Sequence, residues 1–127
     1  MLRILVCDDQ AMLRELLAGA IWAHSPEAEV VLAADGKDAE LKLASGRFDL
    51  VFMDVEMPLQ DGFTTLANVR EQKLAPEAAF IMCTGRFGDE DRARGLALKV
   101  DHYLTKPIDL MTVGQVVKRF APMASTA

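Results

Sequence analysis

The chain has 127 residues, of which 51% are apolar and 26% are charged. This size and composition suit one compact domain with a single core and are too small for two domains. The 14 basic and 19 acidic residues give a net charge of −5, which argues against a surface that binds nucleic acid. Every apolar run is far shorter than the roughly 18 residues that cross a bilayer, and no secretory signal is recognisable. We therefore expect a cytoplasmic protein.

Short apolar runs alternate with segments of helical periodicity along the whole chain. Five runs have the length of a strand: residues 2–7, 30–34, 48–53, 79–83 and 100–104. Three of them are almost continuously apolar, as expected for strands that are buried on both faces. The βα alternation predicts an α/β fold, in which helices cover both sides of a parallel sheet.

The first and last helices have the clearest periodicity. Their apolar stripes are Leu13, Leu16, Leu17, Ala20 and Ile21 in the first, and Leu110, Val113, Val116, Val117 and Phe120 in the last. We expect both stripes to face the core. Asp109 is placed to cap the last helix, whereas residues 25–26, Ser-Pro, end the first.

The three middle helices are placed mainly by the residues that begin them. Asp-Gly pairs at 35–36 and 61–62 and a Gly-Asp pair at 88–89 mark their starts. Residues 121–127 are small or polar, so we expect a domain of residues 1–120 followed by a flexible tail.

Two cysteines, Cys7 and Cys83, are too few to form a disulfide framework in a chain of this size. They are also isolated from His24 and His102, which argues against a zinc site. We expect both thiols to be reduced and buried.

Five polar residues follow strands of the predicted sheet. Asp8 and Asp9 follow the first, Asp54 the third, Thr84 the fourth and Lys106 the fifth. In an open α/β sheet the ligand crevice lies beyond the carboxyl ends of the strands. The five side chains are therefore expected to converge on one place.

This combination of residues suits phosphoryl transfer. Three carboxylates repel one another, and the single ammonium of Lys106 cannot balance them. Oxygen ligands of this kind favour Mg²⁺. With the metal in place, Asp54 is the candidate nucleophile, while Lys106 and the hydroxyl of Thr84 can bind phosphoryl oxygens.

Four segments together form a specific pattern: residues 8–9 (DD), 53–62 (MDVEMPLQDG), 84–85 (TG) and 103–107 (YLTKP). With this pattern the chain resembles, over residues 2–120, the receiver domain of two-component response regulators, in particular the stand-alone chemotaxis-type receivers. The resemblance implies a flavodoxin-like, doubly wound (βα)5 fold with strand order 2-1-3-4-5. In that order Cys7 and Cys83 lie about 9–10 Å apart, at a strand spacing of about 4.8 Å, which is too far for a disulfide.

The resemblance also implies roles for individual residues. Asp54 accepts a phosphoryl group from the phosphohistidine of a histidine kinase or phosphotransfer protein. Mg²⁺ is bound by Asp9, Asp54 and the main-chain carbonyl of Glu56, while Asp8 acts mostly through water. The peptide bond before Pro107 is expected to be cis.

A switch follows from the same resemblance. Phosphorylation draws Thr84 and Lys106 inward, and Tyr103 turns into the space that Thr84 leaves, which reshapes the surface of the fourth helix, fifth strand and fifth helix. From the spacing we add a hypothesis that Glu56 and Arg86 form an ion pair across the mouth of the site, which would hinder hydrolysis.

The prediction is a monomeric, single-domain response regulator that binds neither nucleic acid nor membrane and catalyses only its own phosphorylation and dephosphorylation. Its output can be protein binding, phosphorelay or a phosphate sink, and its target is unknown. One alternative is a Mg²⁺-dependent phosphatase with Glu56 as general acid, although the chain has no cap insertion for a substrate. A flavin or nucleotide binder is disfavoured because Asp8 and Asp9 would repel phosphate.

Overall fold

The computed structural model describes residues 1–86 and 88–121 of the chain. Five strands form one parallel sheet in the order β2-β1-β3-β4-β5, which confirms the predicted fold. The strands are β1 Arg3–Cys7, β2 Glu29–Ala33, β3 Leu50–Asp54, β4 Ala79–Thr84 and β5 His102–Thr105. The helices are α1 Ala11–His24, α2 Gly36–Leu43, α3 Gly62–Glu71, α4 Asp89–Ala97 and α5 Leu110–Phe120. Residues 122–127, almost all of the predicted tail, lie outside the described residues.

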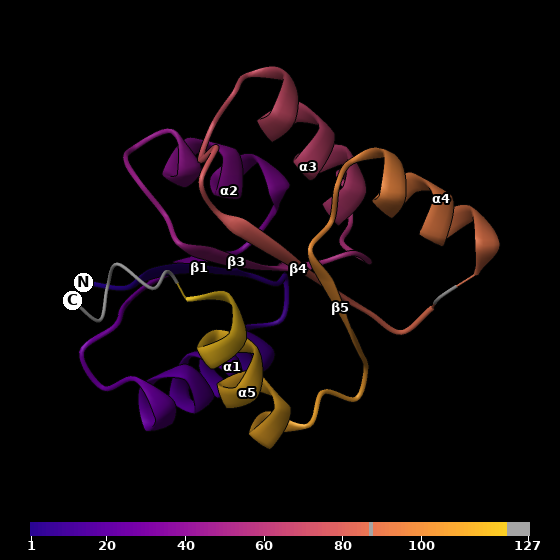
Figure 1. The fold of residues 1–127 in the computed structure, drawn as a ribbon. Helices are drawn as coiled ribbons and strands as arrows, with labels where there is room; N and C mark the ends of the chain where they lie inside the picture. Colours follow the sequence, from indigo (N-terminus) through magenta and orange to yellow (C-terminus); the bar gives the residue numbers. More distant parts are fainter. Residues whose placement is uncertain (87, 122–127) are drawn as a thin grey trace.

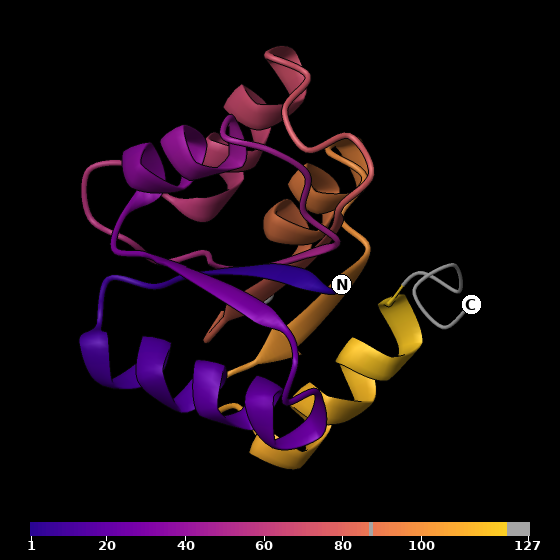
Figure 2. The same ribbon diagram turned by 90° about the vertical axis from the view of Figure 1, so that its left-hand side faces the viewer.

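The helices cover the sheet on both sides. Helices α1 and α5 pack on one face, and α2, α3 and α4 lie on the other (Figures 1 and 2). Side chains of the central strands alternate between two buried clusters: in β1, Ile4 and Val6 contact the α1–α5 side, and Leu5 and Cys7 contact the α2–α3 side. This period of two explains why the strand sequences are almost continuously apolar.

The two cysteines belong to different clusters. Cys7 faces α2 and α3, whereas Cys83 faces α1 and α5, and both are free and buried. Burial is the main cause that raises the pKa of each thiol to about 12. The strand order and these opposite orientations both exclude a disulfide, and the raised pKa keeps both thiols protonated.

Three aspartates begin helices as the sequence indicates. Asp35, Asp61 and Asp109 each accept a backbone hydrogen bond from the first turn of α2, α3 and α5. Each therefore satisfies one of the free N–H groups at a helix start. Along residues 1–86 and 88–121, none of the helices has both the length and the apolar character needed to cross a bilayer.

Two details of the prediction are wrong. The first is strand length: β3 begins at Leu50 instead of residue 48, and Asp54 and Thr84 are the last residues of β3 and β4 instead of following them, because the backbone ladder continues to those residues. The second is burial, because Leu16 and Leu110 are exposed. Both line a hollow between α1 and α5, since each lies at the edge of its helix stripe.

Candidate functional site

Parallel pairing brings the predicted site residues to the carboxyl edge of the sheet. Asp54 pairs with Cys83, and Thr84 pairs with Thr105. Asp8 directly follows β1, whose last residue is level with Met53 of β3. The polar residues therefore lie at the ends of four strands, of which β1, β3 and β4 are the three central ones.

An acidic cluster forms at this edge. Carboxylate oxygens of Asp8, Asp9 and Asp54 lie within 4.8 Å of one another, with Asp8 and Asp54 buried and Asp9 exposed. Burial raises the pKa of Asp54 to about 6, with the Asp8 charge in support and the Lys106 hydrogen bond in opposition. Burial is also the main cause that raises the pKa of Asp8. Ionising these buried carboxyls therefore costs free energy, and a bound cation would offset that cost.

Lys106 provides one positive charge beside Asp54. Its Nζ donates a hydrogen bond of 2.8 Å to Oδ1 of Asp54, which is almost fully buried. Burial alone would lower the pKa of Lys106, but its hydrogen bond to Asp54 and the nearby carboxylates outweigh burial and raise it. The backbone N–H of Lys106 donates to the carbonyl of Thr84, and the following bond to Pro107 is cis.

The carboxylate of Glu56 bonds to the end of β4. Thr84 Oγ1 donates to Glu56 Oε2 at 2.5 Å, and the N–H of Gly85 donates to Glu56 Oε1 at 2.8 Å. Arg86 contributes only backbone groups to this cluster: its N–H donates to Thr84 Oγ1 at 3.0 Å, and its carbonyl oxygen, 2.7 Å from that hydroxyl, is an alternative acceptor for the single hydroxyl proton. The predicted Glu56–Arg86 ion pair is not formed between these two residues, and the Glu56 oxygens accept from Thr84 and Gly85 instead.

Known proteins resemble this chain in sequence and in fold. The family model of the response regulator receiver domain matches residues 4–118. The chain belongs to this receiver family. Phosphorylation of an aspartate is the general function of the family, and its members generally bind Mg²⁺ at an acidic cluster.

Relatives of this receiver differ in length. This chain is 37% identical over 108 residues to the transcriptional regulatory protein TcrA of Mycobacterium tuberculosis. The matched region covers 85% of this chain but only 41% of TcrA. The chain is 29% identical over 121 residues to protein PilG of Pseudomonas aeruginosa, covering 95% of this chain and 88% of PilG. Chemotaxis protein CheY4 of Vibrio cholerae superposes with a TM-score of 0.84 at 29% identity, over 94% of this chain and 98% of CheY4.

Tyr103 of the receiver packs against α4. A Cβ atom at Gly95 would lie 1.4 Å from the Tyr103 hydroxyl oxygen, so only glycine leaves room for the ring there. The ring is half-buried and its hydroxyl oxygen is buried. Tyr103 therefore occupies a notch in α4, which the sequence did not indicate.

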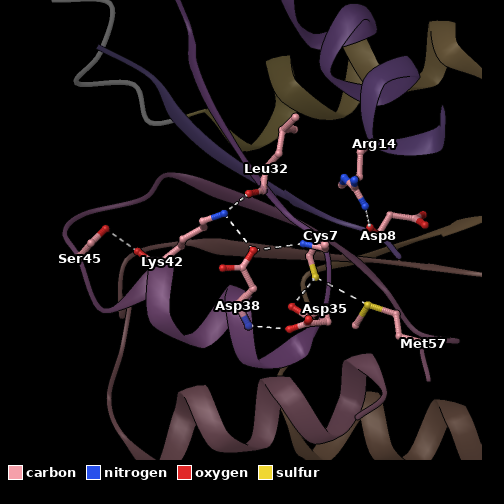
Figure 3. Close-up of polar contacts among 10 residues, drawn as sticks. Cys7, Asp8, Arg14, Leu32, Asp35, Asp38, Lys42, Ser45 and Met57 are labelled. Carbon is pink, nitrogen blue, oxygen red and sulfur yellow. Dashed lines mark hydrogen bonds and ion pairs between the residues drawn. The ribbon is translucent and has the colours of Figure 1, made fainter. Parts of the chain in front are cut away.

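Contacts from α1 and α3 fix the ends of β1 and β3. Arg14 Nη1 donates to the main-chain carbonyl of Asp8 at 2.8 Å (Figure 3). A Cβ atom at Gly62 would lie 2.4 Å from the carbonyl oxygen of Asp54, so α3 can start this close only with glycine. Arg14 was not predicted as a site residue, because it contacts a backbone atom and no sequence motif marks that contact.

Glu40 links α2 to the loop after β3. It accepts hydrogen bonds from Gln60, which belongs to that loop, and from Asn68 and Gln72 near the end of α3. Burial would raise the pKa of Glu40, but these three amide donors together lower it. Gln60 therefore ties the loop beyond Asp54 to an acid with a full set of partners.

Proposed function

We propose that Asp54 is the phosphoacceptor of this receiver and that a phosphohistidine on a histidine kinase or phosphotransfer protein is the donor. The observation that carries this proposal is the 2.8 Å contact between Lys106 Nζ and Asp54 Oδ1 within a cluster of three acids. A buried carboxylate beside one fixed cation is suited to in-line attack on phosphorus.

The transfer requires few protein groups. A carboxylate oxygen of Asp54 forms a bond to phosphorus as the bond between phosphorus and the donor imidazole breaks, and the electron pair leaves with that imidazole. Lys106 neutralises charge on the phosphoryl oxygens, and the Thr84 hydroxyl donates a hydrogen bond to one of them. The product is an acyl phosphate on Asp54.

The residues present fit a magnesium ion. The three carboxylates of Asp8, Asp9 and Asp54 lie close together, with no histidine or cysteine among them. Such a set of oxygen ligands suits a hard cation. We propose that Asp8, Asp9, Asp54 and the main-chain carbonyl of Glu56 would hold Mg²⁺, with Asp8 acting mostly through water. When bound, the ion supplies positive charge to the phosphoryl oxygens.

We further propose that residues 1–120 form the phosphorylation-controlled unit. Thr84 and Tyr103 would move together, and phosphorylation would shift the populations of two surfaces formed by α4, β5 and α5. This surface would bind a protein partner or serve a phosphorelay. The receiver would act as a monomer and catalyse only its own phosphorylation and dephosphorylation.

Intact-mass spectrometry after incubation with acetyl phosphate tests the proposal. We expect one added phosphoryl group with Mg²⁺ present, and none with chelator or in Asp54→Asn. Asp101→Asn is a matched control, because Asp101 lies before β5 at the opposite edge of the sheet, and it should load like the wild type. Equal loading of Asp54→Asn would contradict the assignment.

A further inference from the structure

The Glu56 carboxylate accepts hydrogen bonds from two donors at the end of β4, the strand that pairs with the phosphoacceptor strand β3. Thr84 Oγ1 and the Gly85 N–H both donate to it, one to each oxygen. Asp54 is level with Cys83, so Thr84, the last residue of β4, lies one residue beyond Asp54, and Gly85 follows it. They form a small cradle that already binds an anion.

The same cradle is available to the phosphoryl group. A phosphoryl group on Asp54 would bring up to about two negative charges and three acceptor oxygens, and the Thr84 hydroxyl is the donor assigned to one of them above. A hydroxyl has a single proton, for which the Arg86 carbonyl at 2.7 Å is already an alternative acceptor, so it cannot serve Glu56 and a phosphoryl oxygen at once. The two anions therefore compete for Thr84.

We propose that Glu56 is an internal anion that holds Thr84 and Gly85 in the unphosphorylated receiver and is displaced when Asp54 is phosphorylated. This inference rests on the proposed function of Asp54. Glu56 is then a positioning residue: it sets the resting place of Thr84 and opposes the phosphorylated state.

The surroundings of Glu56 allow this displacement. Its side chain is only half-buried, so it can leave the cradle and be hydrated. When Glu56 leaves, the proton of the Thr84 hydroxyl is freed for a phosphoryl oxygen, while the oxygen of that hydroxyl accepts the N–H of Arg86 in the unphosphorylated receiver. Charge acts in the same direction, because a carboxylate next to a phosphoryl dianion is repelled.

Three substitutions separate contact from charge. Glu56→Asp keeps the charge but shortens the side chain by one methylene, so it cannot span the same two donors. Glu56→Gln keeps the length and removes the charge, and Glu56→Ala removes both. Glu71→Ala is the control, because it removes an acid at the end of α3, away from the site.

The experiment measures binding of beryllofluoride, a phosphoryl analogue that adds to carboxylates, by calorimetry in the presence of Mg²⁺. Because charge-assisted hydrogen bonds to Glu56 are lost, we expect Glu56→Ala and Glu56→Asp to bind at least about tenfold more tightly than the wild type. Glu56→Gln should lie between them and the wild type, and Glu71→Ala should match the wild type.

The amide proton of Gly85 gives a second readout, measured by NMR without any analogue. An N–H that donates to a carboxylate resonates downfield, so the Gly85 signal should move upfield in Glu56→Ala and Glu56→Asp. Wild-type affinity in both variants, with an unmoved Gly85 signal, would overturn the inference and leave Asp54 as phosphoacceptor. Tighter binding by Glu56→Gln alone would also overturn the inference, because it would mean that the negative charge of Glu56, and not its hydrogen bonds, opposes binding. Failure of every protein to bind the analogue would overturn the proposed function as well.

Discussion

The buried acids at the two ends of the strands differ in the charges and hydrogen-bond donors around them. At the amino edge, Asp49 is buried, accepts the N–H of Arg3 at 2.9 Å and lies 3.5 Å from Nη2 of Arg47. At the carboxyl edge, Asp8 and Asp54 are also buried: Asp54 accepts from Lys106 Nζ, Asp8 accepts from the backbone N–H of Gln10, and the Lys106 charge partly offsets the burial that raises the pKa of both. The acid at the amino edge has a cationic partner within the folded chain, whereas at the carboxyl edge one ammonium lies beside a cluster of three carboxylates and leaves charge to be balanced by a ligand. This difference separates an acid that stabilises the fold from acids that serve the reaction.

The largest expected effect is the response to Mg²⁺. A ligand that binds only the native state at 100 times its dissociation constant adds about 2.7 kcal/mol to the free energy of unfolding. We expect thermal denaturation to show this gain in the wild type and in Asp49→Asn. The gain should disappear in Asp54→Asn, and its persistence there would remove the distinction between the two edges.

The next effect is the loss of Asp49. Asp49→Ala leaves the partly buried N–H of Arg3 without its acceptor and Arg47 without one of its two acidic partners. We expect the free energy of unfolding to fall by about 2 kcal/mol, measured by urea denaturation. Asp49→Asn keeps an acceptor oxygen and should cost less. An unchanged midpoint in Asp49→Ala would mean that this acid does not stabilise the fold.

Neutralising Asp54 should have the opposite sign. In chelator at pH 8, Asp54→Asn should raise the free energy of unfolding by about 1 kcal/mol, because the amide relieves burial of a charge and can still accept from Lys106. The pKa of Asp54 is raised to about 6 from 3.8, so the native state takes up its proton first, and the carboxyl destabilises the fold as pH rises through 6. The gain should therefore shrink between pH 6 and 4. A gain that is independent of pH would contradict this explanation.

Glu40 provides the smallest expected effect. It bonds to the loop at the carboxyl edge of the sheet, but three amide groups donate hydrogen bonds to it. We expect Glu40→Gln to lower the free energy of unfolding by about 1 kcal/mol at neutral pH. Since the pKa of Glu40 is lowered, its stabilisation is present above its ordinary pKa and is lost as pH falls. The pH profiles of Glu40→Gln and Asp54→Asn should therefore slope in opposite directions. Profiles with the same slope would show that the edge, and not the partners, determines the behaviour of an acid.

Local patterns were sufficient to predict an α/β fold with a parallel sheet, whereas the strand order 2-1-3-4-5 was implied by the family resemblance. Alternating apolar runs and helical stripes depend on neighbours in sequence, and the capping aspartates act within one turn of their helices. Leu16 and Leu110 were misplaced because periodicity gives the direction of a stripe but not its width, which depends on how closely α1 and α5 approach.

Sheet topology was enough to predict the site residues that lie at the carboxyl ends of the strands. Asp8, Asp9, Asp54 and Lys106 meet because the carboxyl ends of parallel strands meet. The partner of Glu56 was missed, since opposite charges two residues beyond Asp54 and Thr84 suggested an ion pair, while the actual partners are a hydroxyl and a backbone N–H. The notch at Gly95 and the bond from Arg14 to a carbonyl are tertiary contacts that leave no periodic signal in the sequence.

Borohydride trapping after loading with acetyl phosphate and Mg²⁺ tests the central claim most directly, because borohydride reduces an acyl phosphate to an alcohol at the residue that carries it. Peptide mass mapping should then find homoserine at position 54, with Asp8, Asp9 and Glu56 unchanged. Reduction at one of those three acids, or at none, would contradict the assignment of Asp54.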